Sequence, residues 1–101
     1  FTQNSGLWKA EQMEEYLAAF RERTEYISSK LPALAELVQY SEWSYMISMC
    51  DKIKTYELKD CYNIFVELVQ ELKTNQQEFL VSPYIQDFEK EWMQKYILQE
   101  G

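Results

Sequence analysis

The sequence predicts an all-α protein, specifically an antiparallel up-and-down four-helix bundle in which residues 1–101 form a single domain. Apolar residues recur at helical spacing along nearly the whole chain. Only two glycines and two prolines are present, too few for the many tight turns of a β-sandwich or barrel. A hydrophobic content of 47% excludes intrinsic disorder. Short connections make successive helices antiparallel, and an open stack of helix pairs is the alternative.

The first helix is expected to begin after Ser5, because serine is a favoured N-cap residue. It is expected to end before Pro32, since proline disfavours helical geometry in the residue that precedes it. Its apolar positions alternate in steps of three and four; they are Ala10, Met13, Leu17, Phe20, Thr24, Ile27 and Leu31.

A second helix is expected to begin near Pro32, because proline is tolerated in the first turn of a helix. Its apolar positions are Leu34, Leu37, Val38, Trp43, Met46, Cys50 and Ile53. Ser41 followed by Glu42 leaves two alternatives open, because Ser41 is itself a favourable cap. The segment forms either one long helix or two shorter ones.

The third and fourth helices follow from two further patterns. The third pattern is Leu58, Cys61, Phe65, Leu68, Leu72 and Phe79, with a polar interruption at Asn75. The fourth is expected to open at Pro83 with Ser82 as its cap, and its apolar positions are Ile85, Phe88, Trp92 and Tyr96. The predicted core draws on all four helices; it contains Leu17, Phe20, Ile27, Leu34, Cys50, Ile53, Phe65, Leu68, Leu72, Phe88 and Trp92.

Charge and residue counts exclude several classes of function. A net charge of -7 argues against nucleic acid and anionic membrane surfaces as partners, because both attract clustered Lys and Arg. No apolar run reaches the roughly 18 residues of a membrane-spanning helix. The chain contains no histidine, the commonest general base and metal ligand. Glu11, Glu14, Glu15 and Glu22 therefore indicate a solvated helix face, and neither an enzyme, a cofactor nor a metal is expected.

Two cysteines bear on the cellular compartment. Cys50 and Cys61 both fall in apolar stripes and are expected to be buried, reduced and unpaired, although a separation of eleven residues permits proximity across a turn. The N-terminal residues lack the basic and apolar regions of a signal peptide. A cytoplasmic location is expected. The chain does not begin with Met, and we expect it to be an excerpt of a longer protein or a free domain.

The segment from Glu42 to Thr55 resembles the active helix of histidine-containing phosphotransfer (HPt) domains. An acidic residue followed by Trp opens that helix in the family, here Glu42 and Trp43. The phospho-accepting His lies about eight residues later, within a His-x-x-Lys-Gly pattern, and Asp51 stands at its position. Ile53 and Lys54 match the apolar and Lys positions. The helical pattern of the rest of the chain is similar to the family's bundle.

The departures from this family point to a member that transfers no phosphoryl group. Asp51 has no imidazole and forms no phosphoramidate. Thr55 stands where the family has a small Gly, and it lies one turn from Asp51. The resemblance therefore implies a pseudo-phosphotransfer domain that docks a response-regulator receiver domain without chemistry. By position, its docking residues are Ser44, Ser48, Asp51, Lys52, Lys54 and Thr55, with Asp51 expected to be exposed at mid-helix.

The alternative function is an unrelated helical-bundle adaptor or secretion chaperone, because amphipathic four-helix patterns arise in many unrelated proteins. The chain is rich in aromatic residues, with eight Tyr, five Phe and three Trp. Several tyrosines lie beside the apolar stripes: Tyr26, Tyr40, Tyr45, Tyr56 and Tyr84. An exposed aromatic groove would favour the adaptor, whereas an exposed charged face around Asp51 would favour the receiver-docking domain.

Overall fold

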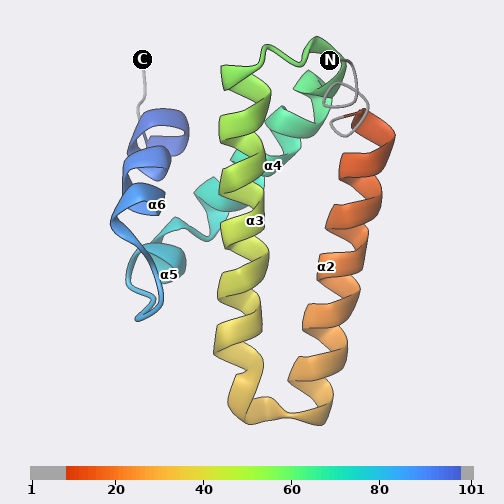
Figure 1. Ribbon diagram of the computed structural model, residues 1–101. Helices are drawn as coiled ribbons and strands as arrows, with labels where there is room; N and C mark the ends of the chain where they lie inside the picture. Colours follow the sequence, from red (N-terminus) through yellow and green to blue (C-terminus); the bar gives the residue numbers. More distant parts are fainter. Residues whose placement is uncertain (1–8, 99–101) are drawn as a thin grey trace.

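Two long helices form an antiparallel hairpin in the computed structural model, which describes residues 9–98 (Figure 1). They are α2, Ala10–Lys30, and α3, Ala35–Thr55, joined through the 3-10 turn η1, Pro32–Leu34. The break at Pro32 lies where the sequence predicts it. Neither Ser41 nor Glu42 interrupts α3, so the alternative of one long helix is confirmed. Ser5, the expected first cap, lies outside the described residues.

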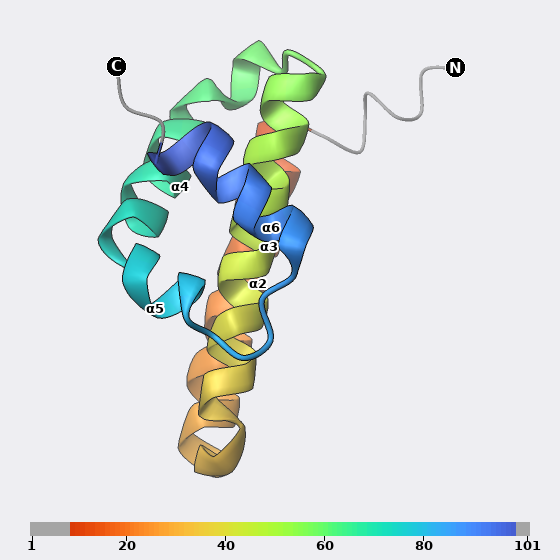
Figure 2. The same cartoon turned by 90° about the vertical axis from the view of Figure 1, so that its left-hand side faces the viewer.

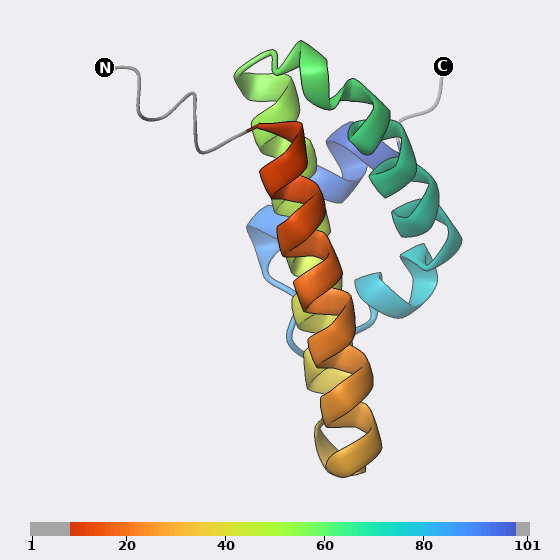
Figure 3. The same ribbon diagram turned by 90° about the vertical axis from the view of Figure 1, so that its right-hand side faces the viewer.

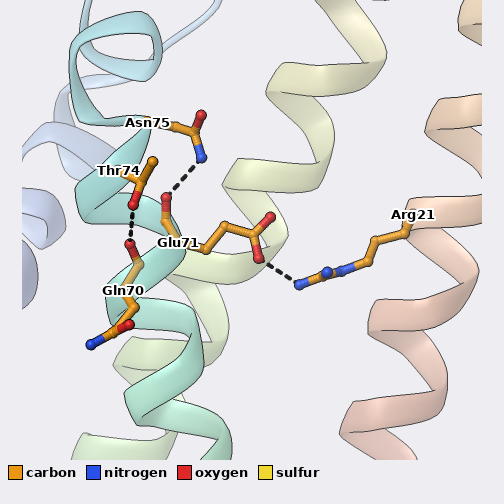
Figure 4. A network of polar contacts seen from close by, with 5 residues as sticks. All are labelled: Arg21, Gln70, Glu71, Thr74 and Asn75. Carbon is orange, nitrogen blue, oxygen red and sulfur yellow. Dashed lines mark hydrogen bonds and ion pairs between the residues drawn. The ribbon is translucent and has the colours of Figure 1, made fainter.

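The third predicted helix is divided into shorter pieces. They are η2, Lys59–Cys61, α4, Tyr62–Thr74, and α5, Gln76–Leu80. The polar interruption at Asn75 separates α4 from α5, because the Asn75 side chain donates a hydrogen bond to the Glu71 carbonyl at 2.8 Å (Figure 4). Such side-chain bonds compete with the helical backbone pattern. After this point the chain turns and α5 continues in a new direction (Figure 3).

One ion pair links the hairpin to α4. Arg21 Nη2 on α2 lies 2.6 Å from Glu71 Oε1 on α4 (Figure 4). The two side chains are 47% and 31% exposed, so solvent screens the pair. Pairs of this kind contribute about 0–1 kcal/mol. The contact orients α4 on the hairpin more than it stabilises the protein.

The last helix begins later than predicted, at Asp87 instead of Pro83. The N–H of Tyr84 donates to the Ser82 hydroxyl at 3.2 Å, so Ser82 and Pro83 belong to a turn. Gln86 caps α6, Asp87–Trp92, in a reciprocal capping box with Glu89. The chain continues directly into a π-helical segment, η3, Met93–Leu98.

The buried face of the last helix differs from the one that the sequence predicts. The predicted stripe of Ile85, Phe88, Trp92 and Tyr96 is wrong in register, since Phe88 is 49% exposed. The buried residues of α6 and η3 are instead Glu89, Met93 and Ile97. The buried face is the one that packs on α3, where Glu89 accepts hydrogen bonds from Tyr40 and Ser44.

The core lies between the upper part of the hairpin and the three later helices. It contains Met13, Leu17, Trp43, Met46, Ile47, Cys50, Ile53, Cys61, Ile64, Leu68, Leu72, Phe79, Met93 and Ile97. Four residues of the predicted core are only half-buried: Phe20, Ile27, Phe65 and Trp92. Leu34, also predicted to be in the core, is 40% exposed. It lies in the hairpin turn, which projects beyond α4, α5 and α6 (Figures 2 and 3).

The described segments are all helical, and no strand occurs within residues 9–98. The chain runs alternately down α2, up α3, down α4 and up α6 (Figures 1 and 2). Only α2 and α3 are full-length neighbours, because α4 crosses α3 obliquely and α6 is short. No helix of this part of the chain has the length and apolar character to cross a membrane.

Truncation of Leu68 tests the position of the core. Leu68 is 1% exposed, and we expect Leu68→Ala to lower the free energy of unfolding by about 2–5 kcal/mol, as for other buried leucines. Val66→Ala on the same helix is the control, because Val66 is 56% exposed. Urea denaturation followed by circular dichroism measures both. A loss below about 1 kcal/mol for Leu68→Ala would place this residue outside the core.

Candidate functional site

The expected docking residues all lie on α3, but they do not form one exposed face. Ser44 and Asp51 form hydrogen bonds with the C-terminal segment α6–η3. Lys54 lies beside Tyr62 and Phe65, at the start of α4. Their states are as follows: Ser44, Ser48, Asp51 and Lys52 are half-buried, whereas Lys54 and Thr55 are exposed.

Asp51 is not the exposed mid-helix residue that the sequence predicts. It lies in the last turn of α3 and is half-buried. Its Oδ1 accepts a hydrogen bond from the Tyr96 hydroxyl at 2.7 Å and a longer one from Thr55 Oγ1 at 3.4 Å. Tyr96 belongs to η3, so the C-terminal segment covers part of the face that a receiver domain would need. The expected burial of Cys50 and Ile53 beside Asp51 is confirmed.

Ser44 contributes to a buried polar cluster around Glu89. Glu89 is 2% exposed and belongs to α6. Its Oε1 accepts hydrogen bonds from the Tyr40 hydroxyl at 2.7 Å and from the Gln86 N–H at 3.0 Å. Its Oε2 accepts a hydrogen bond from the Ser44 hydroxyl. The carboxylate therefore joins α3, α6 and the α6 cap, and it is unavailable to a ligand.

The sequence analysis did not identify Glu89. A signal was present, because Gln86 and Glu89 have the three-residue spacing of a capping box. Recognition of this cap would have moved the predicted helix start from Pro83 to Asp87. The burial of Glu89 has no such signal, because its position relative to Met93 and Ile97 is the same whichever residue begins the helix.

Two tyrosine–carboxylate hydrogen bonds fasten the C-terminal segment to α3. They are Tyr40 to Glu89 and Tyr96 to Asp51. Burial raises the pKa of both tyrosines, and the hydrogen bonds to the carboxylates raise it further. Because a raised pKa favours the protonated phenol, both side chains remain hydrogen-bond donors at and well above neutral pH. Neither is poised to act as a base.

The remaining expected site residues diverge around α3. Lys54 Nζ lies 5.9 Å and 5.4 Å from the ring centroids of Tyr62 and Phe65, within the range of cation–π contacts. Ser48 instead lines a shallow depression of about 410 Å³ between α2 and α3, which also includes Phe20 and Arg23. Asp51 therefore contacts Tyr96 of η3, whereas Lys54 lies beside aromatic rings of α4.

Tyr45 lies next to this depression and packs internally. Its ring stacks on Phe20 with a centroid separation of 4.5 Å. Its hydroxyl is buried without a hydrogen-bond partner among the described residues. Burial raises the pKa of Tyr45 to about 12, and the nearby Tyr16 adds to the shift. The Tyr45 side chain is therefore neutral and packs from α3 against Phe20 of α2.

The two thiols are buried and reduced, and no disulfide joins them. Burial raises the pKa of Cys50 to about 12, with a smaller contribution from the charge of Asp51. Burial also raises the pKa of Cys61, and Asp60 and Glu14 add to the effect. The nucleophilic form of a cysteine is the thiolate, so neither residue is activated. Residues 9–98 also contain no group of three Cys, Asp or Glu side chains arranged to hold a metal ion.

Removal of the Glu89 carboxylate tests its structural role. Glu89→Ala leaves the Tyr40 and Ser44 hydroxyls and the Gln86 N–H without their acceptor. Because unpaired buried polar groups are costly, we expect a loss of about 2–4 kcal/mol in the free energy of unfolding. Glu91→Ala, at an exposed position of the same helix, should stay within about 0.5 kcal/mol of the parent protein. Equal effects of the two substitutions in a urea titration would refute the role assigned to Glu89.

Thiol alkylation tests the burial of Cys50. A pKa of about 12 against an ordinary value of 9.0 leaves roughly a thousandfold less thiolate at neutral pH. We expect iodoacetamide to label Cys50 very slowly in the native protein and rapidly in urea, as measured by mass spectrometry of the peptide. Labelling of Cys50 at the rate of a free cysteine under native conditions would contradict this assignment.

Comparison with known proteins adds no relative from which a role for these residues follows. No protein-family model, no curated protein and no solved structure matches this chain. The resemblance of the Glu42–Thr55 segment to phosphotransfer domains therefore stays a prediction from the sequence. Any function assigned to the chain has to be argued from its own surface and packing.

Proposed function

We propose that this chain is a non-catalytic protein-interaction domain that contacts its partner through the uncovered end of the α2–α3 hairpin. The observation that carries the proposal is the exposure of large apolar side chains at that end. They are Tyr26, Leu31, Leu34 and Leu37, which are 65%, 54%, 40% and 36% exposed. We call these four residues the hairpin-end patch.

The position of this patch supports a contact with another protein. The later helices pack on the upper part of the hairpin, and the turn extends beyond them (Figures 2 and 3). Grouped exposed apolar side chains are uncommon on monomeric proteins and mark interaction sites. Pro32, at the start of η1, restricts the backbone of the turn and lowers the entropy lost on binding.

The non-catalytic part of the proposal is supported by the chemistry of the side chains. The chain has no histidine. The buried tyrosines and Cys50 have raised pKa values, so they are poor nucleophiles and bases near neutral pH. Part of the same proposal is a cytoplasmic setting, where reducing conditions keep thiols from forming disulfides.

Of the two kinds of interaction domain, the adaptor is better supported than the receiver-docking domain. A pseudo-phosphotransfer domain would present the Asp51 face to a receiver. Tyr96 and the segment that carries it occupy part of that face, and this counts against receiver docking unless the segment moves away. We propose an adaptor built as a distorted four-helix bundle, in which the third helix is broken and the fourth is short.

Site-specific photo-cross-linking tests the proposal in cells that produce the protein. A benzophenone amino acid in place of Leu31 should give a discrete adduct with a partner protein, identified by mass spectrometry. The same amino acid in place of Glu15, exposed near the other end of α2, should not give this adduct. The adduct should disappear in a Leu34→Ser/Leu37→Ser background that keeps its helical circular dichroism. Adducts that are absent from position 31, or equal at both positions, would refute the proposal.

A further inference from the structure

We infer that a second surface, next to the hairpin-end patch, binds a positively charged, apolar segment of a partner protein. This inference rests on the proposed function and names the chemistry of the partner. The surface is a groove of about 400 Å³ between the first half of α3 and the end of α5, and Ser28 of α2 also lines it. The residues on which the argument depends are Ala35, Glu36, Tyr40, Trp43, Glu78 and Val81. We call this surface the aromatic groove.

The aromatic groove is the outward continuation of the buried face of α3. Ile47 and Cys50 lie on this face and are fully buried beneath the later helices. Trp43 is the last buried residue of the row, and Gln39 and Ala35 continue it by steps of four residues. Beyond Trp43 the later helices no longer cover this face fully, and Gln39 and Ala35 are half-buried.

The floor of the groove is rigid and aromatic. The Tyr40 ring lies 6.0 Å from the Phe79 ring and 5.7 Å from the Tyr84 ring, centroid to centroid. Trp43 contacts the same Phe79 at 5.8 Å. The Tyr40 hydroxyl is held by Glu89 at 2.7 Å, which fixes the orientation of its ring. A floor ordered before binding lowers the entropic cost of association.

The charges around the groove select a cation. Glu36 and Glu78 are exposed carboxylates at its sides, and none of the residues lining it is basic. Two other depressions differ in this respect, since Lys73 lines the one between α4 and η3, and Arg23 the one between α2 and α3. Lys and Arg pair with carboxylates and also bind the faces of Tyr and Trp rings. The chain's net charge of -7 draws such a partner toward it.

The rim of the groove requires an apolar contact as well. Val81 is 79% exposed, the largest value among the exposed large hydrophobic residues of the described chain. Ala35 lies on the opposite wall and leaves room for a side chain from the partner. The segment that fits therefore has an aliphatic or aromatic residue flanked by Lys or Arg. An acidic or purely polar segment would leave Val81 uncovered and meet Glu36 and Glu78 unfavourably.

Titration with a synthetic peptide tests this inference. The probe is a 14-residue peptide with leucines on one helical face and lysines beside them, and its counterpart has glutamates in place of the lysines. In ¹⁵N-resolved NMR spectra, the lysine peptide should shift the amide signals of Ser28, Gln39 and Val81, and the glutamate peptide should not. Val81→Ser should weaken binding of the lysine peptide. Shifts concentrated elsewhere, or unchanged binding by Val81→Ser, would overturn the inference.

A matched pair of double variants separates the groove from general charge attraction. Glu36→Gln/Glu78→Gln should weaken binding roughly three- to tenfold, because two ion pairs are lost. Glu11→Gln/Glu15→Gln removes the same charge at exposed positions near the other end of the hairpin, and should change the affinity less than twofold. Equal losses in the two variants would overturn the inference.

Three further outcomes relate this result to the proposed function. A dimer in sedimentation velocity that the lysine peptide dissociates would assign the aromatic groove to a second copy of this chain and overturn the inference. Cross-linking from Leu31 without peptide binding in the groove would retain the proposed function and reject only the cationic partner. Peptide binding in the groove without cross-linking from Leu31 would retain the cationic partner and reject the contact through the hairpin-end patch.

Discussion

The buried carboxylate of Glu89 is the contact on which the position of the C-terminal segment α6–η3 depends. A charged group that is 2% exposed is tolerated only when its oxygens are hydrogen-bonded, and here Tyr40, Ser44 and the Gln86 backbone supply the donors. The three donors come from α3 and from the start of α6. The carboxylate therefore fixes the position of the short C-terminal helix on α3, which apolar packing of Met93 and Ile97 alone would specify less strictly.

The position of the C-terminal segment has consequences on both sides of α3. On one side it brings Tyr96 to Asp51 and covers part of the face that resembles a phosphotransfer site. On the other, it orients the Tyr40 ring that forms the floor of the aromatic groove. The same segment packs on the upper hairpin and does not reach the hairpin turn, so it leaves the hairpin-end patch uncovered (Figure 2). By positioning the C-terminal segment, the polar cluster around Glu89 covers part of the Asp51 face and orients the floor of the aromatic groove.

This arrangement explains which apolar and charged side chains remain exposed on the molecule. The core uses nonpolar residues of the upper hairpin, and the polar bonds to Glu89 and Asp51 lie along its edge. The hairpin turn extends beyond the later helices, and the apolar residues of the hairpin-end patch are exposed, as are Glu36 of α3 and Glu78 of α5. A surface that combines apolar area with unopposed negative charge has the character of a protein-binding site.

The sequence by itself determined the helical class, the break at Pro32 and the burial of Cys50, Ile53, Leu68 and Leu72. These features follow from local spacing and from the backbone preferences of proline. Only the tertiary structure decided the phase of α6, the burial of Glu89 and the cover over Asp51. Leu34 and Phe88 show the reason, because periodicity gives the apolar positions of each helix but not how far a neighbouring helix extends to cover them.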